Sequence, residues 1–160
     1  IEGHAPAAGC MLALATDYRI MGAGKNDAPI TIGLNESQFG IVAPPWLAEL
    51  MLLTIGHREG EKALALGTLY TPNDALRVGL VDEVVPSPEV MPRALAEAAK
   101  WAEIPPMARA GSKSIPRKPL LEKLASTRQN DTDSFVSFVA GQGVQKHLGL
   151  YLESLQKKSK

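Results

Sequence analysis

The sequence predicts an α/β protein in its first half, followed by an all-helical C-terminal part. Up to residue 86, short apolar segments typical of β-strands alternate with segments that have the pattern of helices. After residue 86, only helical patterns follow one another. We therefore divide the chain into a first part, residues 1–86, and a helical C-terminal region, residues 87–160.

Length and charge exclude several classes of protein. The 160 residues suffice for one domain, and a hydrophobic content of 45% agrees with a substantial core. The 17 basic residues balance the 17 acidic ones, so net charge indicates no binding to nucleic acid or to a membrane surface. No apolar run is long enough to span a bilayer. The single cysteine, Cys10, excludes an intramolecular disulfide and is expected to be a small buried residue.

The first elements are short. Residues 3–9 form a loop of small residues, and the apolar run 10–15 predicts a short buried helix. The N-terminus of such a helix exposes unpaired N–H groups, which can bind an anion or a developing oxyanion. A simple turn into a core helix is the alternative. Strands are predicted at residues 18–21 and 30–32, with a flexible loop over residues 22–27 between them.

Proline, glycine and threonine mark the ends of the later elements. Thr71 is expected to cap a helix that starts at Pro72, and Gly56 and Gly67 are expected to end two others. A strand is predicted over residues 80–85. Helices are predicted over residues 46–55, 57–66, 72–79, 89–101, 106–114, 119–140 and 144–157.

The last predicted helix carries an apolar stripe. Its members fall on one face and are Val144, Leu148, Tyr151 and Leu155. A single tail helix cannot cover such a face by itself. We expect the stripe to pack against another part of the protein or against a neighbouring subunit.

One carboxylate, Glu36, stands among apolar residues. Its sequence neighbours include Leu34, Phe39, Ile41, Val42 and Trp46, and no Lys or Arg lies between residues 25 and 58. A carboxyl group in apolar surroundings resists ionisation, which allows it to donate and accept protons near neutral pH. The local sequence leaves open that Glu36 is a solvated residue in a surface loop.

Metal chemistry has no support in the sequence. The three histidines, His4, His57 and His147, are far apart and do not have the spacing of metal ligands. We therefore expect neither a metal ion nor a redox cofactor.

Residues 33–46 resemble the catalytic loop of the crotonase (enoyl-CoA hydratase/isomerase) superfamily, in its branch of mitochondrial 3,2-trans-enoyl-CoA isomerases. The resemblance covers essentially the whole chain, through residues 3–10, 16–20, 54–58, 79–86 and 151–153. It implies that residues 1–86 are the C-terminal part of a crotonase-like spiral of ββα turns. It also implies a helical C-terminal region that covers the active site and forms a homotrimer. The start of the protein is then expected to lie outside this chain.

The resemblance also implies a reaction and a site. Glu36 matches the single acid–base residue, and the backbone N–H of Ala8 matches the second donor of an oxyanion hole. The implied reaction moves a proton from C2 to C4 of 3-enoyl-CoA and yields 2-trans-enoyl-CoA, in β-oxidation of unsaturated fatty acids in the mitochondrial matrix. Coenzyme A is part of the substrate, and no separate cofactor is expected. Residues expected to bind the acyl-CoA thioester are Met11, Leu34, Phe39, Ile41 and Trp46. Because the first oxyanion donor lies upstream in the family, this chain alone is expected to be inactive.

Two positions depart from the commonest family pattern. Many members have Gly where this chain has Ala8, and Ala resists positive φ and adds a methyl group. The hydratases of the family use a second glutamate to orient water, and the matching residue here is Met11, which cannot orient water. Met11 therefore favours an isomerase over an enoyl-CoA hydratase, although Met11 also suits plain core filling.

Two further alternatives remain. The chain could belong to another crotonase-type enzyme, such as a thioesterase or dehalogenase, which needs a different placement of carboxylates. It could also be a non-catalytic scaffold subunit that keeps the fold.

Overall fold

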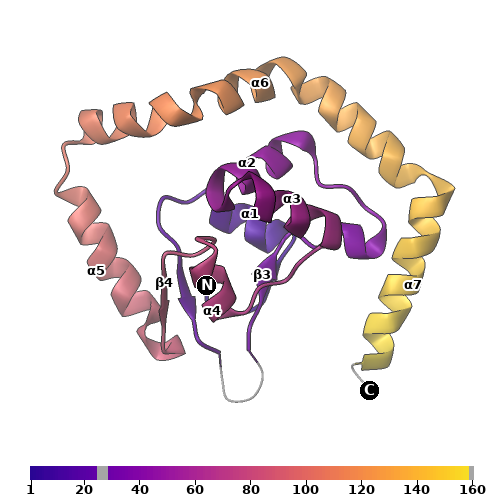
Figure 1. Cartoon of the computed structure of the whole chain (residues 1–160), viewed down its shortest axis with the longest axis horizontal. Helices are drawn as coiled ribbons and strands as arrows, with labels where there is room; N and C mark the ends of the chain where they lie inside the picture. The colour runs from indigo at the N-terminus through magenta and orange to yellow at the C-terminus, as the bar shows by residue number, and fades with distance from the viewer. Residues whose placement is uncertain (25–28, 159–160) are drawn as a thin grey trace.

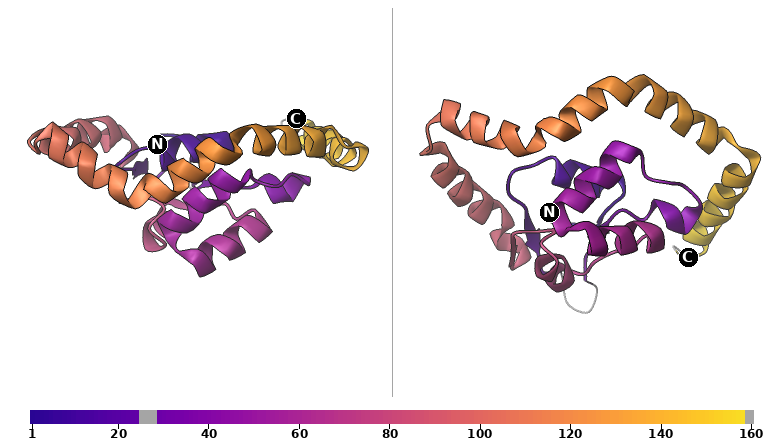
Figure 2. Two further views of the ribbon diagram at one scale, coloured as in Figure 1. Left: turned by 90° about the horizontal axis from the view of Figure 1, so that it is seen from above. Right: turned by 45° about the horizontal axis from the view of Figure 1, so that its top comes forward.

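The computed structural model describes residues 1–24 and 29–158, and the loop expected over residues 22–27 thus lies partly outside the described residues. A central body contains the strands and the first helices (Figure 1). Three long helices then run one after another around the outside of this body (Figures 1 and 2). The predicted division after residue 86 lies between the last strand and this helical arch, and it stays a prediction.

Two pairs of short parallel strands organise the body. Strand β1 (Ala5–Pro6) pairs with β3 (Ile32–Gly33), and β2 (Ile20–Gly22) pairs with β4 (Glu83–Val85). Parallel partners require crossover connections, so helices lie between them in the sequence. The predicted α/β class is therefore correct.

The strand predictions differ from the structure in their bounds. Strand β2 begins at Ile20 instead of residue 18, and β3 covers Ile32–Gly33 instead of residues 30–32. Strand β1 lies inside the segment predicted as a loop, because its pairing with β3, and not its own composition, makes it a strand. The strand predicted over residues 80–85 begins only at Glu83. Leu80 and Val81 instead belong to a tight turn, in which both of their N–H groups donate to the Ala75 carbonyl, at 2.8 and 3.2 Å.

Several helices of the body begin or end at the predicted caps, but α1 begins at Ala8, inside the predicted loop, and α4 ends at Arg77 instead of residue 79. The body contains α1 (Ala8–Leu14), the 3₁₀ turn η1 (Glu36–Phe39), α2 (Pro45–Ile55), α3 (His57–Leu66), α4 (Pro72–Arg77) and η2 (Ser87–Glu89). Thr71 caps α4 by accepting a hydrogen bond from the Asp74 N–H at 3.3 Å. Gly67 ends α3 in the left-handed conformation, with φ 62°.

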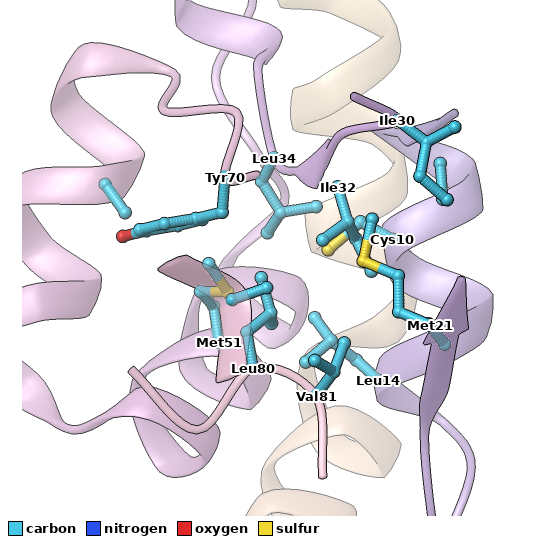
Figure 3. Close-up of a cluster of buried hydrophobic side chains, with 14 of the residues drawn as sticks. Cys10, Leu14, Met21, Ile30, Ile32, Leu34, Met51, Tyr70, Leu80 and Val81 are labelled. Carbon is cyan, nitrogen blue, oxygen red and sulfur yellow. The ribbon is translucent and has the colours of Figure 1, made fainter. Parts of the chain in front are cut away.

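A main core holds the body together. Figure 3 shows its side chains converging from α1, the strands and the later helices. Its largest fully buried members are Cys10, Leu14, Met21, Ile32, Leu34, Met51, Leu80 and Val81. A smaller cluster of Ile20, Val85 and Val90 joins β2 and β4 to α5 (Val90–Ala102). Cys10 is fully buried, as predicted.

The helical arch consists of α5 (Val90–Ala102), α6 (Pro106–Ala140) and α7 (Gln142–Lys158). The prediction of separate helices over residues 106–114 and 119–140 is wrong, because α6 continues through Pro116 and Pro119. A proline inside a helix removes one backbone hydrogen bond and bends the helix without necessarily ending it, and α6 curves around the body (Figure 1). The predicted break before α7 occurs at Gly141 alone, since Gly143 lies within α7.

Candidate active site

The pairing of β1 with β3 places the N-terminus of α1 and Glu36 at the same edge. In this parallel pair Ala5 lies opposite Ile32 and Pro6 opposite Gly33. Helix α1 begins at Ala8, just after β1, and η1 begins at Glu36, just after β3. Because the carboxyl ends of parallel strands meet at one edge, the first N–H groups of α1 and the Glu36 carboxyl come from neighbouring strand ends.

Glu36 lines an apolar cavity of about 320 Å³. Its wall combines residues that follow β3 with residues from α2 and α3. The lining residues include Leu34, Ile41, Val42, Ala48 and Leu64. The apolar surroundings expected for Glu36 are therefore present, and they come from three segments of the chain.

The Glu36 carboxyl is partly buried and lacks a neutralising partner. Its Oε2 atom is buried and makes no hydrogen bond with the described residues, and none of the ion pairs found among those residues involves Glu36. Burial raises the pKa of this carboxyl above its usual value of 4.5, opposed by a hydrogen bond to the Glu36 backbone. A carboxyl with these properties can exchange protons nearer to neutral pH than an exposed one.

Helix α1 lies close enough to Glu36 for the charge of Glu36 to act on Cys10 of this helix. Burial raises the pKa of the Cys10 thiol to about 12, and the negative charge of Glu36 adds to this shift. Ala8 is the first residue of α1, so its N–H group has no acceptor inside the helix. The residue Ala8 is exposed. This N–H is thus available to a ligand oxygen.

The backbone strain expected at Ala8 falls instead on Ala7. Among the described residues, Ala7 alone has a positive φ without being glycine, at 47°. The Ala7 N–H donates to the Gly33 carbonyl at 2.8 Å, and the Ala7 carbonyl accepts from the Met11 N–H at 2.9 Å. These two bonds hold the strained residue between β3 and α1.

The predicted acyl-binding residues separate into two groups. Leu34 and Ile41 share the cavity with Glu36. Phe39 instead faces the arch, with its ring centroid 4.8 Å from that of Tyr151 in α7. Trp46 lines a separate groove against Leu121 and Leu124 of α6, and the half-buried Met11 packs against the core. The structure does not place these last three on the wall of the Glu36 cavity, and their role in binding substrate stays a prediction.

Two residues of the cavity wall could not be predicted from the sequence. Ala48 and Leu64 carry no chemical signal, and they reach the cavity because α2 and α3 pack against each other. Only the amphipathic pattern of α3 could have suggested a packing role for Leu64, since α2 is apolar on most of its surface.

Nearby glutamates are engaged elsewhere. Glu59 accepts hydrogen bonds from Tyr70 at 2.8 Å and from Lys62 at 2.7 Å, and Glu49 pairs with Lys123. Neither lines the Glu36 cavity.

In the described part of the chain, no group of three or more His, Cys, Asp or Glu side chains is arranged to bind a metal ion. A search of the same residues finds no helix that is both long and apolar enough to cross a bilayer.

In this structure, parallel strand ends place a half-buried glutamate in an apolar cavity beside the start of a short helix, and a helical region wraps around them. This arrangement defines a crotonase-type protein. The chain belongs to the enoyl-CoA hydratase/isomerase family, whose model matches residues 1–160. It is 49% identical to the mitochondrial enoyl-CoA delta isomerase 1 of Rattus norvegicus over 158 residues, and 46% identical to that of Homo sapiens over 156 residues.

The fold gives the same result. The crystal structure of human mitochondrial delta3-delta2-enoyl-CoA isomerase matches 99% of this chain with a TM-score of 0.92 and 45% sequence identity. The fold is thus crotonase-like, with a helical C-terminal region. The chain spans 54% of the rat protein, 51% of the human protein and 60% of the chain in the crystal structure.

Proposed function

We propose that the protein containing this chain converts 3-enoyl-CoA to 2-trans-enoyl-CoA. The observation that carries this proposal is the half-buried carboxyl of Glu36 in an apolar cavity, with an Oε2 atom that has no hydrogen-bond partner among the described residues. The relatives named enoyl-CoA delta isomerase 1 support the reaction class.

In the proposed reaction Glu36 acts first as base and then as acid. Its carboxylate removes a proton from C2, and the electrons of that C–H bond form the new C2–C3 double bond through a dienolate. The electrons of the former C3–C4 double bond then take the proton back from Glu36 at C4. The raised pKa suits both steps, because the group must bind the proton and release it again.

The dienolate carries negative charge on the thioester oxygen. The N–H of Ala8, an exposed residue at the start of α1, is proposed as one donor to this oxygen. The other donor, the first in chain order, lies upstream in the family. We therefore expect residues 1–160 alone to be inactive. The reaction uses coenzyme A as part of its substrate and calls for no other cofactor.

Met11 distinguishes isomerisation from hydration. A hydratase needs a second group that orients water, and neither Glu49 nor Glu59 lines the Glu36 cavity. The apolar Met11 on α1 supports transfer to C4 without addition of water. A thioesterase or dehalogenase would need a different carboxylate, and a scaffold subunit would not need Glu36 at all.

The names of the relatives support a proposal for the cellular setting. Both relatives are named as mitochondrial, and we propose that this protein acts in the mitochondrial matrix, in β-oxidation of unsaturated fatty acids. We further propose a homotrimer built through the helical region.

The Glu36→Gln variant tests the function. In the natural protein that contains this chain, we expect kcat for 3-enoyl-CoA to fall by at least about 10²-fold with a smaller change in KM, because the amide cannot carry the proton. The exposed Glu89 is the matched control, and Glu89→Gln should retain wild-type kinetics. Near-wild-type turnover by Glu36→Gln would contradict the assignment.

A further inference from the structure

The position of the Glu36 carboxyl depends on the backbone of η1. Its Oε2 atom has no hydrogen-bond partner among the described residues, so no side chain holds that oxygen in place. The turn itself is closed by local bonds, from the Gln38 N–H to the Asn35 carbonyl at 3.1 Å and from the Ile41 N–H to the Glu36 carbonyl at 3.0 Å. These bonds shape the turn but do not fix it to the body.

Gln38 joins η1 to the end of α3. Its Nε2 atom donates to the Gly67 carbonyl at 2.8 Å, across 29 positions of sequence. The contact is partly buried, which makes the bond stronger than an exposed one. Helix α3 also supplies Leu64 to the Glu36 cavity, so Gln38 ties the glutamate to the wall that it faces.

Gly67 fits closely under the same turn. A Cβ atom at this position would lie 2.7 Å from Gln38 Cγ, 2.8 Å from Ser37 Oγ and 3.2 Å from Asn35 Cα. Gly67 also has φ 62°, which favours glycine. The side chains of Ser37 and Gln38 and the backbone of Asn35 therefore lie against Gly67, on both sides of Glu36 in the sequence.

We propose that Gln38 is a positioning residue for Glu36. Gln38 does this by binding η1 to Gly67, which has no side chain to obstruct the turn. This proposal rests on the proposed function of Glu36. Gln38 does not touch the substrate in this account. It holds η1 against α3, so that the carboxyl stays buried and within reach of both carbons.

The first test compares two glutamines that use the same donor atom. Gln38→Met keeps the length of the side chain and removes the Nε2 donor. Gln129→Met is the control, since Gln129 Nε2 donates to Asp133 Oδ1 at 2.9 Å on exposed α6. We expect Gln38→Met to lower kcat about 10-fold or more with KM changed less than about 3-fold, and Gln129→Met to match the wild type.

The pH profile separates positioning from plain stability. If Gln38→Met loosens η1, water reaches Glu36, and the burial that raises its pKa is partly lost. The acidic limb of kcat/KM against pH should then move to lower pH. A loss of stability alone would leave this limb in place.

The second test changes the other partner. Gly67→Ala places a methyl group against Gln38 and Ser37, and we expect the same loss of kcat and the same shift of the acidic limb. Gly79→Ala is the control, because Gly79 also has a positive φ, 78°, but its nearest neighbour to a new Cβ is 3.9 Å away. If Gln38→Met does not fold, the pair Gly67→Ala and Gly79→Ala decides.

Wild-type kcat and an unmoved acidic limb in Gln38→Met would overturn the positioning role. The same would follow if Gly67→Ala and Gly79→Ala behaved alike. Failure of the proposed function is distinguishable, because Glu36→Gln would then also keep its activity. An inactive Glu36→Gln beside a fully active Gln38→Met would remove the Gln38 proposal alone.

Discussion

The carboxyl group of Glu36 lies where its charged form is disfavoured. Burial raises its pKa above 4.5, and Oε2 has no hydrogen-bond partner among the described residues. The native state therefore binds this proton more tightly than the unfolded chain does. The ionised group costs stability in full above its folded pKa, and the cost disappears as pH falls below the unfolded value near 4.5.

This linkage predicts that Glu36→Gln is more stable than the wild type at pH 8. The neutral amide removes the cost of burying a charge, so its melting temperature should be higher there. The difference should shrink as pH falls toward 4, where both carboxyl and amide are uncharged. Thermal unfolding of the two proteins at both pH values measures it, and an equal or lower melting temperature for Glu36→Gln at pH 8 would contradict the account.

Sequence reasoning found Glu36 but not the contacts that hold it. The apolar neighbours and the missing local cation could be seen in residues 33–46. The bond between Gln38 and Gly67 spans 29 positions and depends on how α3 packs. Likewise, Gly67 could be predicted as a helix end, but the positive φ of Ala7 arises only from the junction of β1 with α1.

At the scale of elements, α7 packs against η1. The rings of Phe39 and Tyr151 are in contact with their planes tilted by 32°, and a Cβ on Gly40 would lie 3.2 Å from His147 Cβ. Val144, Leu148 and Tyr151 of the predicted stripe are half-buried, while the side chain of Leu155 lies outside the described ones. The stripe therefore packs in part on the body of its own chain.

Tyr151→Ala tests this contact. Because Tyr151 is half-buried, we expect a loss of about 1–2 kcal/mol, less than for a fully buried aromatic residue. Leu152→Ala is the control on the same helix, since Leu152 is 58% exposed, and it should cost below about 0.5 kcal/mol. Denaturant unfolding measures both, and equal losses would show that the contact with Phe39 contributes nothing.

Element boundaries were predictable wherever one residue fixes them. Thr71 and Pro72 start α4, and Gly67 ends α3, because their backbone or capping chemistry acts locally. Pro116 and Pro119 predicted a break between two helices, but α6 continues through both of them. Strand β1 was missed because two residues carry no pattern of their own.

At the scale of the whole molecule, the arch presents apolar side chains to its surroundings. Exposed fractions reach 87% for Met107, 74% for Ile115 and 59% for Val136, and α6 has no buried residue among those described. Large exposed apolar surfaces mark contacts with other protein surfaces. The exposed apolar side chains of the arch are therefore available for the subunit contacts of the proposed homotrimer.

Ile115→Asp is expected to weaken that trimer. A charge placed in an apolar interface carries a desolvation cost, so the equilibrium should shift toward smaller species. Leu66→Asp is the control, because Leu66 is 64% exposed on α3 and outside the arch. Sedimentation at micromolar concentration reads out both, and equal trimer content in both variants would contradict an interface at this part of α6.

Sequence patterns alone predicted the α/β class and the helical C-terminal region. They did not predict how short strands assemble, since β1 to β4 each have at most three residues. The spiral arrangement came from the resemblance to the crotonase family. Long-range pairing, such as Ile20 with Glu83, leaves no local trace in the sequence.

In the proposed reaction one carboxyl, without a second group to activate water, shifts a double bond and does not hydrate it. A product analysis tests this by following what the natural protein forms from 3-enoyl-CoA and, separately, from 2-trans-enoyl-CoA. We expect 2-trans-enoyl-CoA from the first substrate and negligible 3-hydroxyacyl-CoA from either. Formation of 3-hydroxyacyl-CoA at a rate comparable to isomerisation would contradict it.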